Sequence, residues 1–283
     1  MVMRRVLKHH VCLCVLSTAV LAGLVLLTDQ NKVYAGLNCN GVANSSGDGI
    51  RSDNNSGRIE CDGRSNGKGS GGQLSGKRTI DMSGTWTRGT SNSDGPAVKV
   101  HGRGTNITIS SELKITDSSK SNTYPAIMVY DRGGLTVNNV NATGVYKGIE
   151  VKGSGSSVIV VKGSIGVRTD GGAVIEVSGG GDVTLNRGVT VGTVSASKEV
   201  ILINNGGNVT VMGTSFTGVQ KGIVFKGTEK ANVSGGAEGA TINLTSGGTG
   251  ITMQGSGGAS ATVMSMTIQG KGSTGGYGGR SLF

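Results

Sequence analysis

Apolar and polar positions alternate in short phrases along residues 96–268, and one phrase recurs seven times. In this phrase two apolar residues flank one free position, usually with a small residue just ahead. The copies are Val98-Lys99-Val100, Ile127-Met128-Val129, Ile149-Glu150-Val151, Ile175-Glu176-Val177, Ile201-Leu202-Ile203, Ile223-Val224-Phe225 and Ile251-Thr252-Met253. Their first apolar residues are 22 to 29 positions apart. A repeat of about 20–50 residues is typical of a solenoid or an array, so this region is interpreted as a stack of similar units.

Each repeat also contains two further apolar phrases, which in the first repeat are Ile107-Thr108-Ile109 and Leu113-Lys114-Ile115. Period-two alternation rich in Val, Ile and Thr predicts half-buried strands. Gly, Asn, Ser and Asp stand between the phrases and favour turns. Helical spacing of apolar residues is absent from the repeats. We therefore predict an all-β fold, a right-handed three-stranded parallel β-helix of about seven turns.

An antiparallel β-sandwich is the alternative fold for a glycine-rich chain of this kind. Parallel strands need a long connection between them, and a coil of 22–29 residues provides one without a helix. One repeat cannot bury its apolar side alone, whereas stacked repeats share a continuous core. A sandwich would not require the same phrase to return in every repeat, so the β-helix is favoured.

Residues 1–35 are predicted to be a secretory signal peptide. Basic residues within positions 4–8 precede an apolar run over residues 11–27. Val33-Tyr34-Ala35 has small residues in the right places for cleavage between Ala35 and Gly36. The alternative is a membrane anchor, but the apolar run is at the short end of what spans a bilayer.

Residues 36–95 are expected to form a Gly/Ser-rich N-terminal cap or a partly disordered tail, with Thr79–Met82 and Trp86 as the incoming half-turn. Cleavage of the leader would leave two cysteines, Cys39 and Cys61, and an even count in an exported chain favours one disulfide. A cap would cover strand edges that otherwise pair with other chains. Residues 96–268 then form the β-helix, and residues 269–283 form a Gly-rich tail.

Charge and composition narrow the function. The net charge is +10 with scattered basic residues, which fits a mild preference for anionic surfaces such as sulfated glycans. Nucleic acid is not expected as a partner, because no recognised module or interleaved aromatics accompany the charge. His101 is the one histidine beyond the leader, so the sequence offers almost no residues for a catalytic triad or a His/Cys metal site. We expect no cofactor and no metal.

Two outward acids are the one hint of catalysis. Glu150 and Glu176 occupy the free position in successive repeats, so in-register strands would place their side chains about 5 Å apart. Retaining glycosidases use such a separation. However, Lys152 follows closely and no cluster of further acids and bases is visible. A solvent-exposed ladder of glutamates, whose repulsion the lysine reduces, is therefore favoured over an enzyme.

The outward face of the recurring phrase is the candidate binding surface. Exposed apolar residues rimmed by charge can mark an interface. The alternative is that turn loops cover this face, or that single exposed apolar residues carry no meaning. A flat wall suits protein recognition, and no deep pocket is expected. The candidate receptor-binding residues are Lys99, His101, Met128, Tyr130, Lys152, Leu202, Val224 and Lys226.

The leader also carries a resemblance. Met1-Val2-Met3-Arg4-Arg5-Val6, the stretch from His9 to Ala19, and the ending Lys32-Val33-Tyr34-Ala35 resemble the leader of Bartonella autotransporters. The layout over residues 36–268 resembles autotransporter passengers in general. That group includes angiogenic-factor passengers, which are secreted mitogens for endothelial cells that act through a vascular growth-factor receptor.

The resemblance implies a passenger exported through the periplasm to the cell surface or beyond, binding a host cell-surface protein as a virulence factor. The most specific form of this expectation is a pro-angiogenic mitogen. The alternative function is an adhesin for extracellular matrix or sulfated glycans, and the third is a polysaccharide hydrolase or lyase. The family pattern continues into a C-terminal membrane β-barrel, whose alternating strands are not recognisable here. Membrane contact is therefore expected only through a separate or missing barrel.

Overall fold

The computed structural model describes residues 39–40, 58–62, 71–83, 95–192, 199–255, 259–271 and 277–281. All of them belong to the compact unit Gly36–Phe283. The predicted leader, its Ala35/Gly36 cleavage site and Trp86 lie outside the described residues. Within the described part, strands account for nearly all regular structure, and the helix present is one 3-10 turn, η2 (Gly236–Glu238). The fold is an all-β parallel solenoid of about six turns.

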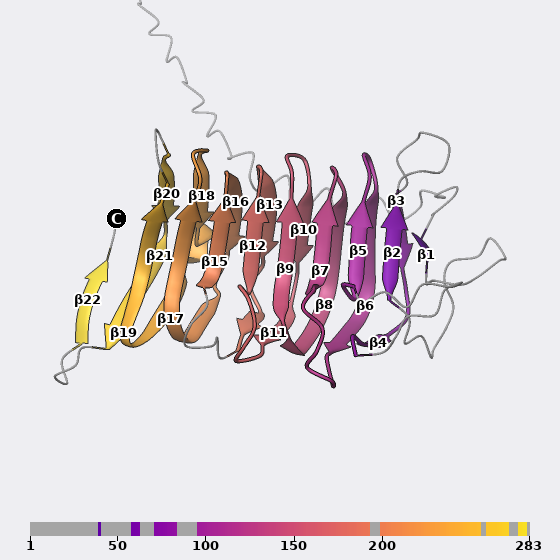
Figure 1. Cartoon of the computed structure of the whole chain (residues 1–283), viewed down its shortest axis with the longest axis horizontal. Coiled ribbons are helices and arrows are strands. Elements are labelled where there is room, and N and C mark those ends of the chain that lie inside the picture. Colours follow the sequence, from indigo (N-terminus) through magenta and orange to yellow (C-terminus); the bar gives the residue numbers. More distant parts are fainter. Residues whose placement is uncertain are drawn as a thin grey trace, which may run out of the picture. The chain divides into compact units, whose positions relative to one another are not determined.

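The recurring phrase forms a ladder of parallel strands, which we call the first ladder. Figure 1 shows its strands side by side in chain order. They are β2 (Ile59–Asp62), β5 (Val98–His101), β7 (Pro125–Tyr130), β9 (Lys147–Lys152), β12 (Ile175–Ser178), β15 (Glu199–Asn204), and the C-terminal parts of β17 (Ser215–Lys226) and β19 (Ala240–Gln254).

Register in this ladder follows the predicted column. Val98 pairs with Ile127, Ile127 with Ile149, and Ile149 with Ile175. The column continues through residues 201, 223 and 251. The prediction that the first apolar residues of successive repeats stack on one another is confirmed.

The other two phrases form the second and third ladders. The second contains β3 (Gly71–Leu74), the starts of β6 (Asn106–Thr116) and β8 (Gly134–Val145), β10 (Ser157–Val160), β13 (Gly181–Leu185), β16 (Gly207–Val211), β18 (Ala231–Ser234) and β20 (Ala261–Met264). The third contains β4 (Arg78–Asp81), the ends of β6 and β8, β11 (Gly163–Val167), β14 (Val189–Val191), the starts of β17 and β19, and β21 (Met266–Lys271).

Parallel pairing begins earlier in the chain than the seven phrases indicated. Strand β2 pairs with β5, so Ile59 lies in register with Val98 and Cys61 with Val100. Strands β3 and β4 likewise pair with β6. The reason is that Ile59-Glu60-Cys61 repeats the apolar-free-apolar pattern with a cysteine in the second apolar position.

Two short strands run antiparallel to the rest. Strand β1 (Cys39–Asn40) pairs with β2 and places Cys39 opposite Cys61. Strand β22 (Tyr277–Ser281) pairs with β21 in the same antiparallel manner. Antiparallel neighbours interrupt the parallel stacking and cover part of the strand edge at each end.

The interior is filled by the apolar residues of all three ladders, because alternate side chains of each strand point inward. Ile149, Ile175 and Phe216 are all fully buried. Burial weakens in the last turn, where Met253 and Met264 are 49% and 50% exposed. A solenoid unit obtains its burial from both neighbours, so a unit with a neighbour on one side keeps part of its core exposed.

Glycine permits the close approach of neighbouring turns at defined points. Gly163 has φ of +124°, and a Cβ there would lie 1.8 Å from the Val140 carbonyl oxygen. No other residue type adopts this backbone at that distance without a shift of the chain. Gly163 is therefore required by the close contact with the neighbouring turn.

Candidate binding face

The outward side chains of the first ladder form two adjacent rows, which we call the binding face. They point outward because the flanking positions of each phrase point into the core. One row holds Glu60, Lys99, Met128, Glu150, Glu176, Leu202, Val224 and Thr252. The next holds His101, Tyr130, Lys152, Ser178, Asn204, Lys226 and Gln254.

All eight candidate residues lie on this face, but they are not equally accessible. Val224 is 2% exposed and His101 is 8% exposed, so the expectation that both face water is wrong. Leu202 and Lys226 are half-buried and lie beyond Lys152 along the solenoid. Their strands β15 and β17 are two and three strand spacings from β9, roughly 10–14 Å at about 4.8 Å per spacing.

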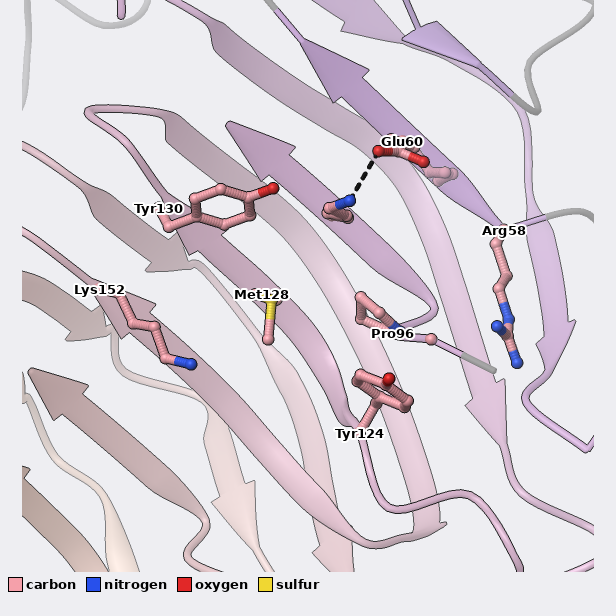
Figure 2. Close-up of a pocket in the computed structure, with 10 residues that line it drawn as sticks. Arg58, Glu60, Pro96, Tyr124, Met128, Tyr130 and Lys152 are labelled. Atoms are coloured by element: carbon pink, nitrogen blue, oxygen red, sulfur yellow. Dashed lines mark hydrogen bonds and ion pairs between the residues drawn. The ribbon is translucent and has the colours of Figure 1, made fainter. Parts of the chain in front are cut away.

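A pocket of about 420 Å³ opens at the N-terminal end of the binding face (Figure 2). The sequence analysis expected no deep pocket and did not locate this concavity. Four of the candidate residues, from β5, β7 and β9, meet there with residues that the sequence analysis did not select. The lining residues are Arg58, Ile59, Glu60, Gly95, Pro96, Lys99, Tyr124, Met128, Tyr130 and Lys152.

Tyr124 reaches the pocket because the preceding loop is tied to an earlier turn. The buried Asn122 donates from Nδ2 to the carbonyl oxygens of Met82 at 3.0 Å and Gly95 at 3.2 Å. Its Oδ1 accepts a hydrogen bond from the Tyr124 N–H at 2.8 Å. The Asn122 N–H donates to the buried Asp117, which also accepts from Arg168. These bonds fix the loop and leave Tyr124 41% exposed.

A charged and aromatic cluster forms one wall of the pocket. Lys99 Nζ donates to Glu60 Oε1 at 2.8 Å, and His101 Nε2 lies 3.4 Å from the same oxygen. The rings of His101 and Tyr130 are stacked, with centroids 4.9 Å apart and planes 2° apart. Lys99 Nζ lies 5.9 Å from the centre of the Tyr130 ring. In Figure 2 Tyr130 lies near the dashed contact of Glu60.

Burial and pairing act in opposite directions on this cluster. Burial raises the pKa of Glu60, but the hydrogen bond and charge of Lys99, with His101 adding to them, outweigh burial and leave the pKa lowered. Burial likewise lowers the pKa of Lys99, yet the bond to Glu60 and its charge leave it raised. Both groups are therefore ionised at neutral pH, and each holds the other in place.

The two glutamates flagged by the sequence are register partners on β9 and β12. Lys147 Nζ bridges them, at 3.2 Å from Glu150 Oε2 and 2.6 Å from Glu176 Oε2, and Lys152 also pairs with Glu150. Burial raises the pKa of Glu150, but the hydrogen bond from Lys152 and the charges of Lys147 and Lys152 leave it lowered. A general acid needs a raised pKa, so the lowered pKa of Glu150 does not suit that role.

The binding face combines charge, aromatic surface and a concavity on a β-solenoid, and this combination makes it the candidate binding site. In the described residues no group of three or more His, Cys, Asp or Glu is placed to hold a metal ion. Among the same residues, no helix is long and apolar enough to cross a membrane. No family model, curated protein or solved structure matched this chain.

The residues that the sequence analysis missed are mostly distant in the chain. Arg58 and Glu60 precede the seven recurring phrases, and Tyr124 lies in a loop. One signal was available for Glu60, since Ile59-Glu60-Cys61 repeats the phrase that marked the other outward positions. Nothing local marked Tyr124, because its position depends on the bonds of Asn122 to residues 82 and 95.

Proposed function

We propose that this chain is a secreted, passenger-type β-helix that binds a protein on the host cell surface through its binding face. The observation that carries the proposal is the meeting of Tyr124, Met128 and Tyr130 with Lys99 and Lys152 around one pocket. Aromatic residues and methionine are enriched at the cores of interfaces, and a polar rim usually surrounds them. Growth-factor-like stimulation of endothelial cells is the specific form, and it follows from the leader resemblance.

We also propose that the solenoid is a right-handed helix with three strands per turn and seven turns. A Cys39–Cys61 disulfide, as expected of an exported protein, would close its N-terminal end. The support for the disulfide is register, since Cys39 lies opposite Cys61 on antiparallel strands. Opposed residues on such strands have Cα atoms about 4.5–5.5 Å apart, which is within the range that a disulfide spans.

The test is to add the purified mature chain to endothelial cells and to measure cell binding and receptor phosphorylation. We expect saturable binding that Tyr130→Ala weakens and that Lys114→Ala does not. Lys114 is exposed on the third ladder, so it reports on a face that the proposal does not use. Equal loss with both variants, or no binding by the native chain, would contradict the proposal.

An adhesin for matrix or sulfated glycans is the second candidate, supported by the basic side chains that line the pocket. Cell attachment without receptor phosphorylation, together with firm retention on heparin, would favour it. The polysaccharide-cleaving alternative has no such support, because lysines hold Glu150 and Glu176 as an ion-paired pair. It would require a cleavage activity that Glu150→Gln abolishes.

A further inference from the structure

We propose that the pocket holds a single acidic sugar residue at the end of a glycan chain, with its carboxylate beside the lysines and its ring against the tyrosines. This inference rests on the proposed function, because it names a ligand for the same face.

The size of the pocket suits one sugar ring with its substituents. A volume of about 420 Å³ lies near the lower end of the range of about 300–1,000 Å³ that is usual for small-ligand sites. The ligand is therefore a compact group presented from outside.

The tyrosines of the pocket offer aromatic surface against which a sugar ring can pack. Tyr124, Met128 and Tyr130 come from one short segment, β7 and the residue before it, and Figure 2 shows Met128 between the two tyrosines. A tyrosine ring offers an apolar face together with a polar hydroxyl, and so matches a sugar, which has apolar ring faces and polar edges. Tyr124 is 41% exposed, so its ring is accessible from solvent.

Charge limits the ligand to one acidic group. The pocket is lined by Arg58, Lys99 and Lys152 and by one acid, Glu60, which accepts from Lys99, while Lys152 pairs with Glu150 beside the pocket. Further along the same face the acids Glu150 and Glu176 come next. These carboxylates are already paired with Lys147 and Lys152, so a polyanionic chain laid along the solenoid would find little unpaired positive charge there, whereas one acidic residue at the pocket would not need it.

Strand pairing disfavours an extended peptide. Strand β5 pairs with β2 and β7, and β7 pairs with β5 and β9, so the strands under the pocket have no free edge. Addition of a peptide strand to the sheet edge, which supplies much of the affinity in that mode of recognition, is therefore blocked at this site. A rigid sugar ring also loses less conformational entropy on binding than a flexible peptide.

The experiment measures binding of sialyllactose, lactose, methyl glucuronide, a heparin hexasaccharide and an acidic tyrosine-containing peptide to the full mature chain, by calorimetry and saturation-transfer NMR. We expect sialyllactose or methyl glucuronide to bind, and lactose to bind at least about tenfold more weakly because it lacks the charge. Which of the two acidic sugars binds identifies the source of the glycan.

The variants Lys152→Gln and Tyr124→Ala should each weaken that binding by about tenfold, while Lys114→Gln leaves it unchanged. Thermal unfolding of each variant confirms that the fold is retained. Equal binding of lactose, preference for the heparin hexasaccharide or the peptide, or insensitivity to Lys152→Gln would each overturn the proposal.

A cell assay separates this inference from the proposed function. Removal of sialic acid or of uronate-containing glycans from the cells, according to which sugar binds, should reduce attachment of the chain. Attachment that survives both treatments would overturn the acidic-sugar inference and leave the proposed function standing. Absence of attachment to untreated cells would overturn the proposed function itself.

Discussion

The ring of His101 lies flat against the ring of Tyr130, with 4.9 Å between their centroids and 2° between their planes. The two residues are register partners on β5 and β7, so the solenoid itself brings them together. His101 is buried beneath, and Tyr130 forms part of the pocket wall. The histidine therefore positions the tyrosine and does not itself meet a ligand.

Replacing His101 with alanine should loosen Tyr130. Stacked aromatic pairs contribute about 0.5–1.5 kcal/mol, so His101→Ala should lower the free energy of unfolding by about that amount and weaken ligand binding a few-fold. His101→Phe keeps a ring beneath Tyr130 and should restore binding. Urea denaturation and a cell-binding isotherm measure the two effects, and failure of the phenylalanine to rescue binding would contradict the role assigned to the stack.

Loss of Asn122 should affect both stability and the pocket. Asn122→Ala leaves the Met82 and Gly95 carbonyls without this donor, at a cost of about 1–3 kcal/mol for buried groups, and releases the segment that leads to Tyr124. Thr123→Ala is the matched control, because Thr123 is exposed in the same loop. We expect the urea midpoint and pocket binding to fall for Asn122→Ala alone; equal behaviour of the two variants would exclude the anchoring role.

Acid should destabilise the solenoid through its paired carboxylates. The pKa values of Glu60 and Glu150 lie below the ordinary 4.5, and that of Asp81, for which hydrogen bonds from Ser118 and Ser83 outweigh burial, is lowered from 3.8 to about 2. A lowered folded-state pKa stabilises fully above the unfolded-state pKa and is lost as pH falls through the folded value. Stability should therefore decline below about pH 4.5 and continue to fall towards pH 2.

Stability at alkaline pH should depend on the paired lysines. Burial lowers the pKa values of Lys99 and Lys147, but bonds to Glu60 and Glu176 leave both above 10.5. Their contribution is complete below the unfolded-state pKa and is lost as pH rises through the folded value. Urea midpoints measured across the pH range should form a plateau between the two limits, and a flat profile into strong acid would refute the ion-pair account.

Core truncation should cost more in the middle of the solenoid than in the last turn. Ile149→Ala removes a fully buried side chain with partners on both sides, and such changes cost about 2–5 kcal/mol. Ile251 occupies the same column but is partly exposed, so Ile251→Ala should cost clearly less. Urea unfolding of the two variants makes the comparison, and equal losses would contradict the stacking account of stability.

Local alternation was enough to predict the column of isoleucines and the outward rows. Ile127, Ile149 and Ile175 could be aligned from the chain alone, because side chains on a strand alternate between faces and each repeat shows the same phrase. The pairing of Glu150 with Glu176 followed from the same alignment, and it is confirmed. Ile59 was missed, because the cysteine in its phrase and a glycine-rich neighbourhood obscured the pattern.

The pocket, in contrast, was decided by tertiary structure. Tyr124 owes its place to Asn122, whose partners at Met82 and Gly95 are 40 and 27 residues away. The burial of Val224 and His101 on an outward row could not be read from alternation, because a strand's period states which face a side chain occupies and not what covers it. The sequence determined which residues of successive turns stack on one another, and long-range contacts determined where the candidate pocket forms.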